Sequence, residues 1–265
     1  MADCDRRRLR TTFTEDAELY DRARPGYPPE LFDDLAELTT VGKDCRVLEI
    51  GCGTAQATIP LARRGCQVVA VELGAQMADI ARRNLAMFPA VRVATAAFED
   101  WGLPDEPFDV VFAATAFHWI DPATRVQKAA DALRIGGSLA TITTHHIAGG
   151  SVDFFHEAQA CYEKFDPATP VGLRLVPAVE IPRDSTETDR SGRFGPALFR
   201  RYEWELSYST GQYVELLNTY SGNRALDPAH RIPLLECIGK LIDGSYGGQI
   251  TKRYLSELQV ATRSD

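Results

Sequence analysis

The chain has 265 residues, a net charge of −8 at neutral pH, 45% hydrophobic residues and 25% charged residues. These values are typical of a globular protein, and the length suffices for one large α/β domain that carries a smaller cap. No apolar run approaches the roughly 18 residues of a membrane helix. The N-terminal MADCDRRRLR lacks the apolar core of an export signal. We therefore expect a cytoplasmic protein with no membrane partner, and its acidity argues against a nucleic-acid partner.

Neither the basic residues nor the cysteines are predicted to form a functional site. The one basic cluster, residues 6–10, is expected to lie in a frayed terminus. The six cysteines, Cys4, Cys45, Cys52, Cys66, Cys161 and Cys237, form no CxxC pair. Their spacing indicates neither a metal site nor a disulfide framework, so we expect buried free thiols.

The first 145 residues alternate strand-like apolar runs with helical patterns, which is typical of a parallel sheet covered by helices on both faces. A helix is expected to begin at Pro28 and Pro29 and to run to about Leu38, because proline suits a first helical turn. Strands are then predicted at 46–50, 67–72, 91–95, 109–114 and 138–144, and helices at 57–64, 74–87 and 122–133. The segment IGG at 135–137 is expected to end the last of these helices.

After His146 the pattern changes to a proline-rich region and a polar stretch, DSTETDRSGRFG, that predicts an exposed loop. A strand is predicted at 197–209, helices at 211–220 and 228–242, and a last strand at 248–262. These elements indicate a terminal antiparallel pair of strands with a helical lid inserted between them. The aromatic residues Phe199, Tyr202, Trp204 and Tyr208 are interpreted as a packed face of the first of these strands.

The stretch VLEIGCGTA places two glycines, Gly51 and Gly53, directly after a predicted strand. In an open parallel sheet, ligands bind beyond the carboxyl ends of the strands. Glycine leaves the backbone bare there and tolerates a positive φ. Glu72 closes the next strand, 21 residues after Gly51, near the offset of about 20 residues at which a carboxylate binds the hydroxyls of a ribose. The pattern predicts a nucleoside cofactor.

Two families of nucleoside cofactor remain, and the loop favours one of them. The dinucleotide pattern GxGxxG has a third glycine where this chain has Gln56. Glu49, Gly51 and Gly53 instead resemble the first motif of class I S-adenosylmethionine-dependent methyltransferases. AVELGAQMADIARRN resembles the second motif of that family, and ATAAFEDWGLPDEPFDVVFAATAFHWID the third and fourth. ELYDRARPGYP and the FHW triplet are similar to enzymes with a type 11 methyltransferase domain, related to trans-aconitate methyltransferase.

This resemblance implies a doubly wound, mostly parallel seven-stranded sheet with a helical cap. It implies a segment at 1–40 that covers the cofactor, a core at 41–150 that binds it, and a region at 151–265 with the last strands and the substrate cap. S-adenosyl-L-methionine would be the cofactor, S-adenosyl-L-homocysteine the product and a small molecule the acceptor; no metal is implied. The implied cofactor-binding residues are Tyr20, Arg24, Glu49, Gly51, Cys52, Gly53, Glu72, Leu73, Met77, Ala97, Phe98, Glu99, Ala114 and Thr115.

Several of these residues have an expected role. Glu72 would bind the ribose, Glu99 would accept from the adenine amine, and Arg24 would pair with the methionine carboxylate. The family usually has glycine where this chain has Ala55, and often an acidic residue where it has Ala97. A positive φ at Ala55 would cost about 1 kcal/mol and would weaken cofactor binding.

Candidate catalytic residues follow the fourth and fifth strands. His118 and Trp119 come after the fourth strand, and His145 and His146 end the fifth. Trp119 would shield the sulfonium or shape the acceptor pocket. A histidine would act as a general base for a hydroxyl or amine acceptor, whereas a carboxylate acceptor needs no base.

Two other functions stay open at this point. One is a protein that binds S-adenosylmethionine or S-adenosylhomocysteine without catalysis, which Ala55 keeps possible. The other is an NAD-dependent oxidoreductase, which Gln56 and the lack of an evident Tyr and Lys pair for hydride transfer disfavour. The sequence fixes neither the acceptor nor the oligomeric state.

Overall fold

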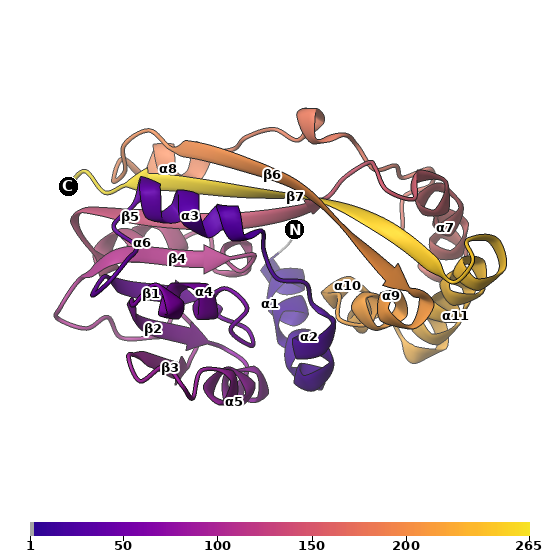
Figure 1. Ribbon diagram of the computed structural model, residues 1–265, viewed down its shortest axis with the longest axis horizontal. Coiled ribbons are helices and arrows are strands. Elements are labelled where there is room, and N and C mark those ends of the chain that lie inside the picture. The colour runs from indigo at the N-terminus through magenta and orange to yellow at the C-terminus, as the bar shows by residue number, and fades with distance from the viewer. Residues whose placement is uncertain (1–2) are drawn as a thin grey trace.

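The protein is described here by a computed structural model of residues 3–265. Residues 1–2, part of the predicted covering segment, lie outside the described residues. A seven-stranded sheet with the order β3-β2-β1-β4-β5-β7-β6 runs through the molecule (Figure 1). The strands are β1 (Arg46–Ile50), β2 (Gln67–Glu72), β3 (Val91–Thr95), β4 (Phe108–Ala114), β5 (Leu133–His146), β6 (Leu198–Ser209) and β7 (Gln249–Thr262). β7 pairs antiparallel with β5 and β6, and the other pairs are parallel. This confirms the predicted doubly wound, mostly parallel sheet.

Helices cover both faces of the parallel strands, because successive side chains of each strand point to opposite faces. On one face, α3 (Pro29–Leu38), α4 (Thr58–Arg63) and α5 (Ala75–Asn84) pack against a core that includes Val47 and Phe112. On the other face, α6 (Arg125–Ala132) packs against Leu48, Ile50 and Val111. The carboxyl ends of β1, β2, β4 and β5 therefore meet at one edge of the sheet.

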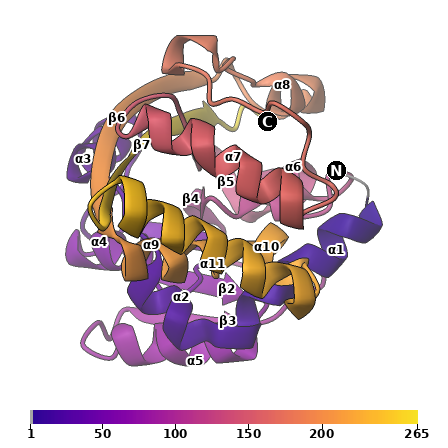
Figure 2. The same ribbon diagram turned by 90° about the vertical axis from the view of Figure 1, so that its right-hand side faces the viewer.

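β6 and β7 extend beyond the parallel strands and carry the cap at one end of the molecule (Figures 1 and 2). The cap contains α7 (Val152–Phe165), α9 (Thr210–Leu217), α10 (Ser221–Ala225) and α11 (Pro228–Ser245). A separate core joins Phe154 of α7, Leu216 of α9 and Ile238 of α11 to Tyr254 of β7. The lid between the last two strands is as predicted. α7 was not predicted, and the stretch expected as an exposed loop contains α8 (Thr186–Ser191).

The N-terminal residues form α1 (Asp3–Thr11), a short 3₁₀ helix η1 (Thr12–Asp16) and α2 (Ala17–Ala23). The expectation that residues 6–10 lie in a frayed terminus is wrong. Arg6 is 4% exposed and donates to the carbonyl of Trp119 at 2.8 Å. Trp119 belongs to the 3₁₀ helix η2 (Phe117–Trp119). The basic residues thus fasten α1 to the carboxyl end of the sheet.

Gly136 and Gly137 lie inside β5 instead of ending the helix before it. Leu133 already pairs with Phe108, and the register then shifts between Phe108 and Val110. A Cβ on Gly137 would lie 2.9 Å from the carbonyl oxygens of Arg134 and Asp109. The glycine therefore allows the two backbones to approach at this irregularity.

Cys161 of α7 and Cys237 of α11 form a disulfide. The expectation of free thiols is wrong for this pair, while Cys45, Cys52 and Cys66 are buried and free. The two bonded cysteines are 76 residues apart, so no local spacing reveals the bond.

Within residues 3–265, no helix has the length and the apolar character that crossing a membrane requires. No group of three or more His, Cys, Asp or Glu side chains in the described part of the chain could hold a metal ion.

Candidate functional site

The loop between β1 and α4 has the backbone that its glycines predict. Gly51 has a φ of 67° and Gly53 a φ of 59°. A Cβ on Gly51 would lie 2.6 Å from the Cβ of Ala116, which follows β4. At Gly53 the nearest atoms would be 3.7 Å away, on Gln56, Met77 and Tyr20. Close approach and positive φ both require glycine at 51, whereas at 53 the requirement is the positive φ.

Glu72 links this loop to the next one. Its carboxylate accepts from the backbone N–H of Gly53 at 2.9 Å through one oxygen and from that of Gly74 at 2.9 Å through the other. Burial raises the pKa of Glu72, and these hydrogen bonds oppose the rise. An ionised carboxylate has about four acceptor sites, so each oxygen can accept a further hydrogen bond. Glu72 is thus fixed in place and still able to receive two hydroxyl groups.

A first cavity, of about 100 Å³, lies against Glu72 and the glycine loop. Most of the residues that the resemblance marked as cofactor-binding line it, namely Tyr20, Gly51, Gly53, Glu72, Leu73, Met77, Ala97, Phe98, Glu99, Ala114 and Thr115. Three of them do not. Arg24 lines the neighbouring cavity, and Glu49 and Cys52 are buried outside the lining.

The two carboxylate oxygens of Glu99 differ in their hydrogen-bond partners. One oxygen accepts from Arg10 at 2.5 Å and from the backbone N–H of Asp121 at 3.2 Å. The second oxygen, Oε2, is buried without a hydrogen-bond partner. Partial burial opposes ionisation of Glu99, but hydrogen bonds to its own backbone and Arg10 outweigh it and lower its pKa. A buried acceptor beside this cavity fits a ligand that brings a donor, such as an adenine amine.

Arg10 and Phe13 also line the first cavity and were not predicted. They reach it because α1 and η1 lie across the carboxyl end of the sheet. No motif marks either residue, and the charged character of residues 3–11 concealed their contacts with the rest of the chain.

Glu49 is 1% exposed and has one carboxyl oxygen without a hydrogen-bond partner. Burial raises its pKa to about 8, and the nearby Glu72 adds to the rise. The side chain is therefore mostly protonated at pH 7. It lies in β1, two residues before Gly51.

Two residues at this edge of the sheet have a backbone that is uncommon for their type. Ala55 has a φ of 82° and is fully buried, and Thr115 has a φ of 52°. The hydroxyl of Thr115 hydrogen-bonds that of Tyr27 at 2.8 Å. Such strain clusters at functional sites. The alanine that departs from the family pattern thus does adopt the positive φ that glycine would supply there.

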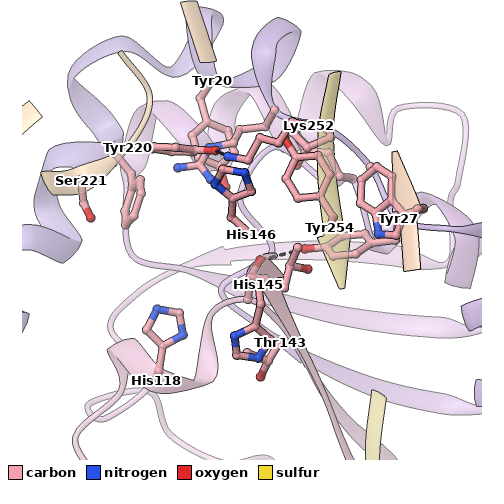
Figure 3. Close-up of a pocket in the computed structure, with 18 of the residues that line it drawn as sticks. Tyr20, Tyr27, His118, Thr143, His145, His146, Tyr220, Ser221, Lys252 and Tyr254 are labelled. Carbon is pink, nitrogen blue, oxygen red and sulfur yellow. Dashed lines mark hydrogen bonds between the residues drawn. The ribbon is translucent and has the colours of Figure 1, made fainter. Parts of the chain in front are cut away.

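Figure 3 shows residues that line a second cavity, which has a volume of about 400 Å³. The first and second cavities share Phe13, Tyr20, Thr115 and Trp119 in their linings. The predicted catalytic candidates His118, Trp119, His145 and His146 all line the second cavity. Burial lowers the pKa of His145 and of His146. Packing around His118, together with Arg125, lowers its pKa as well, so all three rings are neutral at pH 7.

The second cavity also contains two cations. Arg24 donates to the carbonyl of Thr219 at 2.9 Å, and its guanidinium lies 5.0 Å from the ring of Tyr20 and 4.7 Å from that of Tyr220. Lys252 is 2% exposed and donates to the hydroxyl of Tyr220 at 2.6 Å. Within residues 3–265 no Asp or Glu lines this cavity.

Tyr220 lies between these cations. Burial would raise its pKa, but Lys252 and Arg24 outweigh that effect and lower it. Tyr220 and Lys252 are hydrogen-bonded across 32 positions of the chain, a contact that no local pattern in the sequence indicates. The pair forms only when the cap folds back over β7. Trp204, expected only to pack on its sheet, stacks on Tyr254 at 4.6 Å and also lines this cavity.

Known proteins that resemble this chain in sequence are methyltransferases. Residues 48–141 match the methyltransferase domain family. The uncharacterized methyltransferase Rv3342 of Mycobacterium tuberculosis is 39% identical over 139 residues, which are 52% of this chain and 54% of that protein. The chain thus matches about half the length of this curated relative.

Two solved structures show the fold over most of the chain. A putative type II methyltransferase from Anaeromyxobacter dehalogenans is 25% identical, with a TM-score of 0.58 over 91% of this chain and 97% of that one. A phosphoethanolamine N-methyltransferase from Haemonchus contortus, solved with phosphomonomethylethanolamine and S-adenosylhomocysteine, is 15% identical, with a TM-score of 0.50 over 89% of this chain and 52% of that one. The matched proteins are methyltransferases, and the matches do not reach the narrower trans-aconitate methyltransferase group.

Proposed function

We propose that this chain transfers a methyl group from S-adenosylmethionine to a small-molecule acceptor, and that it is related to the trans-aconitate methyltransferase group. The observation that carries the proposal is the first cavity. A buried carboxylate, Glu72, holds the glycine loop there, and Gly51 keeps the backbone bare. Both features fit a nucleoside with a free ribose.

The residues present fit the whole cofactor. Glu72 would bind the two ribose hydroxyls with charge-assisted hydrogen bonds. Phe98 and the unpartnered oxygen of Glu99 would hold the adenine. The methionine part would cross the glycine loop toward the second cavity, where Arg24 would pair with its carboxylate. When bound, the sulfonium supplies an electrophilic methyl group.

The chain's own contribution would be position and the exclusion of water. Thr115 and Trp119 line both cavities, so they lie where donor and acceptor would meet. α1 and α2 cover this junction, and Arg10 fixes α1 to Glu99. An acceptor with a hydroxyl or an amine would use a neutral histidine of the second cavity as general base, for which His118 and His145 are the candidates.

Calorimetry on the full chain tests the proposal. We expect S-adenosylmethionine and S-adenosylhomocysteine to bind and NAD not to bind. Glu72→Ala should weaken binding by about 2 kcal/mol, the loss expected for charged hydrogen bonds. Glu236→Ala, at an exposed position of α11, serves as the control and should bind as the wild type does. Preferential binding of NAD, or full affinity in Glu72→Ala, would contradict the proposal.

Binding without turnover would favour the alternative of a non-catalytic binding protein. Product formation with a pool of small metabolites and labelled S-adenosylmethionine separates the two functions.

A further inference from the structure

A third cavity, of about 450 Å³, lies under α7 in the cap. Its wall includes apolar side chains from α7, α9 and α11, among them Phe155, Ala158, Leu217 and Ile238. Val152 and Leu173 line it as well and are exposed at 49% and 57%. Exposed apolar residues beside an apolar chamber are typical of a site that receives an apolar ligand. The function proposed above makes no use of this chamber.

Three residues line both the second and the third cavity, namely His146, Tyr220 and Lys252. In Figure 3 they lie together on one side of the second cavity, away from His118 and Thr143. A single ligand can therefore contact both chambers only by passing these three side chains.

Lys252 is the charged residue among the three that line both cavities. Its ammonium has three donors, of which one goes to the hydroxyl of Tyr220. In the described part of the chain, no carboxylate lies within ion-pairing distance of Lys252. The rings of Tyr220 and Tyr254 lie 4.9 Å and 5.0 Å from its nitrogen. Buried cations are normally paired with an anion, so this one is suited to an anionic ligand.

Besides Lys252, the charged residues that line the third cavity are Asp166 and Arg174. The Asp166 carboxylate is used within its own turn, where it accepts from the backbone N–H of Ala168 at 3.1 Å and from the hydroxyl of Thr169 at 2.9 Å. Arg174 is exposed. His146 is neutral, because burial and Lys252 lower its pKa.

We propose that the methyl acceptor is an amphipathic carboxylic acid, whose carboxylate lies in the second cavity beside Lys252 and whose apolar chain extends into the third. The proposal rests on the methyltransferase function proposed above and names its substrate class. A short polycarboxylate would leave the apolar chamber empty. An ammonium acceptor would be repelled by Lys252 and Arg24.

The reaction that this geometry favours needs no proton transfer. A carboxylate oxygen forms the new bond to the methyl carbon, and the bond from that carbon to sulfur breaks, with its electron pair going to sulfur. The negative acid and the positive sulfonium become a neutral methyl ester and a neutral thioether. The carboxylate is ionised at pH 7 without help from a base, which agrees with a second cavity that carries no acidic side chain.

The test compares a series of acceptors on the full chain with S-adenosylmethionine. The probes are the straight-chain acids from butyrate to tetradecanoate, trans-aconitate, octylamine and octanol. We expect methyl esters, with kcat/KM at least tenfold higher for dodecanoate than for butyrate. A preference for trans-aconitate, octylamine or octanol, or a lack of dependence on chain length, would overturn the inference.

Two variants locate the two ends of the acid. Lys252→Met should weaken dodecanoate binding about 30-fold, as expected for the loss of a charged hydrogen bond, and should raise KM more than it lowers kcat. Lys240→Met, at a position 79% exposed on α11, is the matched control and should change neither. Ala158→Phe narrows the third cavity and should abolish the preference for long chains while butyrate turnover persists. Unchanged dodecanoate binding in Lys252→Met would refute the proposed contact between Lys252 and the carboxylate, even if Ala158→Phe fails to fold.

Calorimetry separates this inference from the proposed function. If S-adenosylhomocysteine binds and dodecanoate does not add to that complex, the acceptor class is wrong and the methyltransferase function stands. If neither form of the cofactor binds, the function itself is wrong.

Discussion

Gly51 and Ala116 are so close that a Cβ atom on Gly51 would lie 2.6 Å from the Cβ of Ala116. The contact joins the end of β1 to the segment after β4, and both residues line the first cavity. It explains why the loop needs glycine here for two separate reasons, a positive φ and a lack of space.

These two reasons can be separated by a pair of substitutions. Gly51→Ala should lower the free energy of unfolding by about 3 kcal/mol, from the strained φ and the overlap together. Adding Ala116→Gly removes the overlap and should restore part of the loss, leaving the cost of the strained φ. Urea unfolding of both variants measures this, with Gly102→Ala as control because no atom lies within 4 Å of that Cβ. Additive losses in the double variant would show that the overlap does not limit this position.

Ala55 stores strain in the same loop, since its φ is 82°. Replacing it with glycine relieves the strain but increases the entropy of the unfolded chain, so the two effects oppose each other. The comparison is Ala57→Gly. There φ is −96°, so glycine relieves no strain and only the greater entropy of the unfolded chain affects stability. We expect Ala57→Gly to cost about 1 kcal/mol, and Ala55→Gly to be more stable than Ala57→Gly by about 1 kcal/mol. Equal losses in the two variants, measured by urea unfolding, would mean that Ala55 is not strained.

Glu49 makes stability depend on pH in a predictable direction. Its pKa is about 8 in the folded protein and has a usual value of 4.5. Between these values the folded state holds a proton that the unfolded state has lost, so the free energy of unfolding falls as pH rises through this range. At about 1.4 kcal/mol for each pKa unit, the total fall in the free energy of unfolding is about 5 kcal/mol.

Glu49→Gln removes this titration. We expect the variant to gain stability relative to the wild type from pH 4.5 to pH 8, with no further gain above that range. Urea unfolding at several pH values measures the difference. A difference that stays constant with pH would mean that Glu49 ionises inside the fold at its usual pKa.

Local patterns were enough to predict the first three strands at their observed bounds. β1 and β2 are short, largely apolar runs, and a glycine follows each within two residues, whereas β3 alternates apolar and polar residues. For the same reason Gly51, Gly53 and Glu72 could be predicted as one site. These three residues lie at the carboxyl ends of adjacent parallel strands, so the strand order alone is enough to predict that they come together.

The features that were missed depend on contacts between distant parts of the chain. Arg6 is held by the carbonyl of Trp119, 113 positions away, so its charge alone predicted a frayed end. Lys252 meets Tyr220 only because β7 runs antiparallel between β5 and β6 and the cap folds back on it. Neither contact has a signature in the residues next to it.

The disulfide between Cys161 and Cys237 is the one covalent link between α7 and α11, the helices that wall the third cavity. A loop of 76 residues closed by a disulfide raises the free energy of unfolding by about 4 kcal/mol, chiefly by restricting the unfolded chain. Cys237→Ser should lose that amount, and dithiothreitol should lower the wild type to the same level without affecting the variant. Titration of the unfolded, oxidised wild type should find at most four of the six thiols. Six reactive thiols in the oxidised protein would show that the bond does not form, and would restore the free cysteines that a reducing cytoplasm predicts.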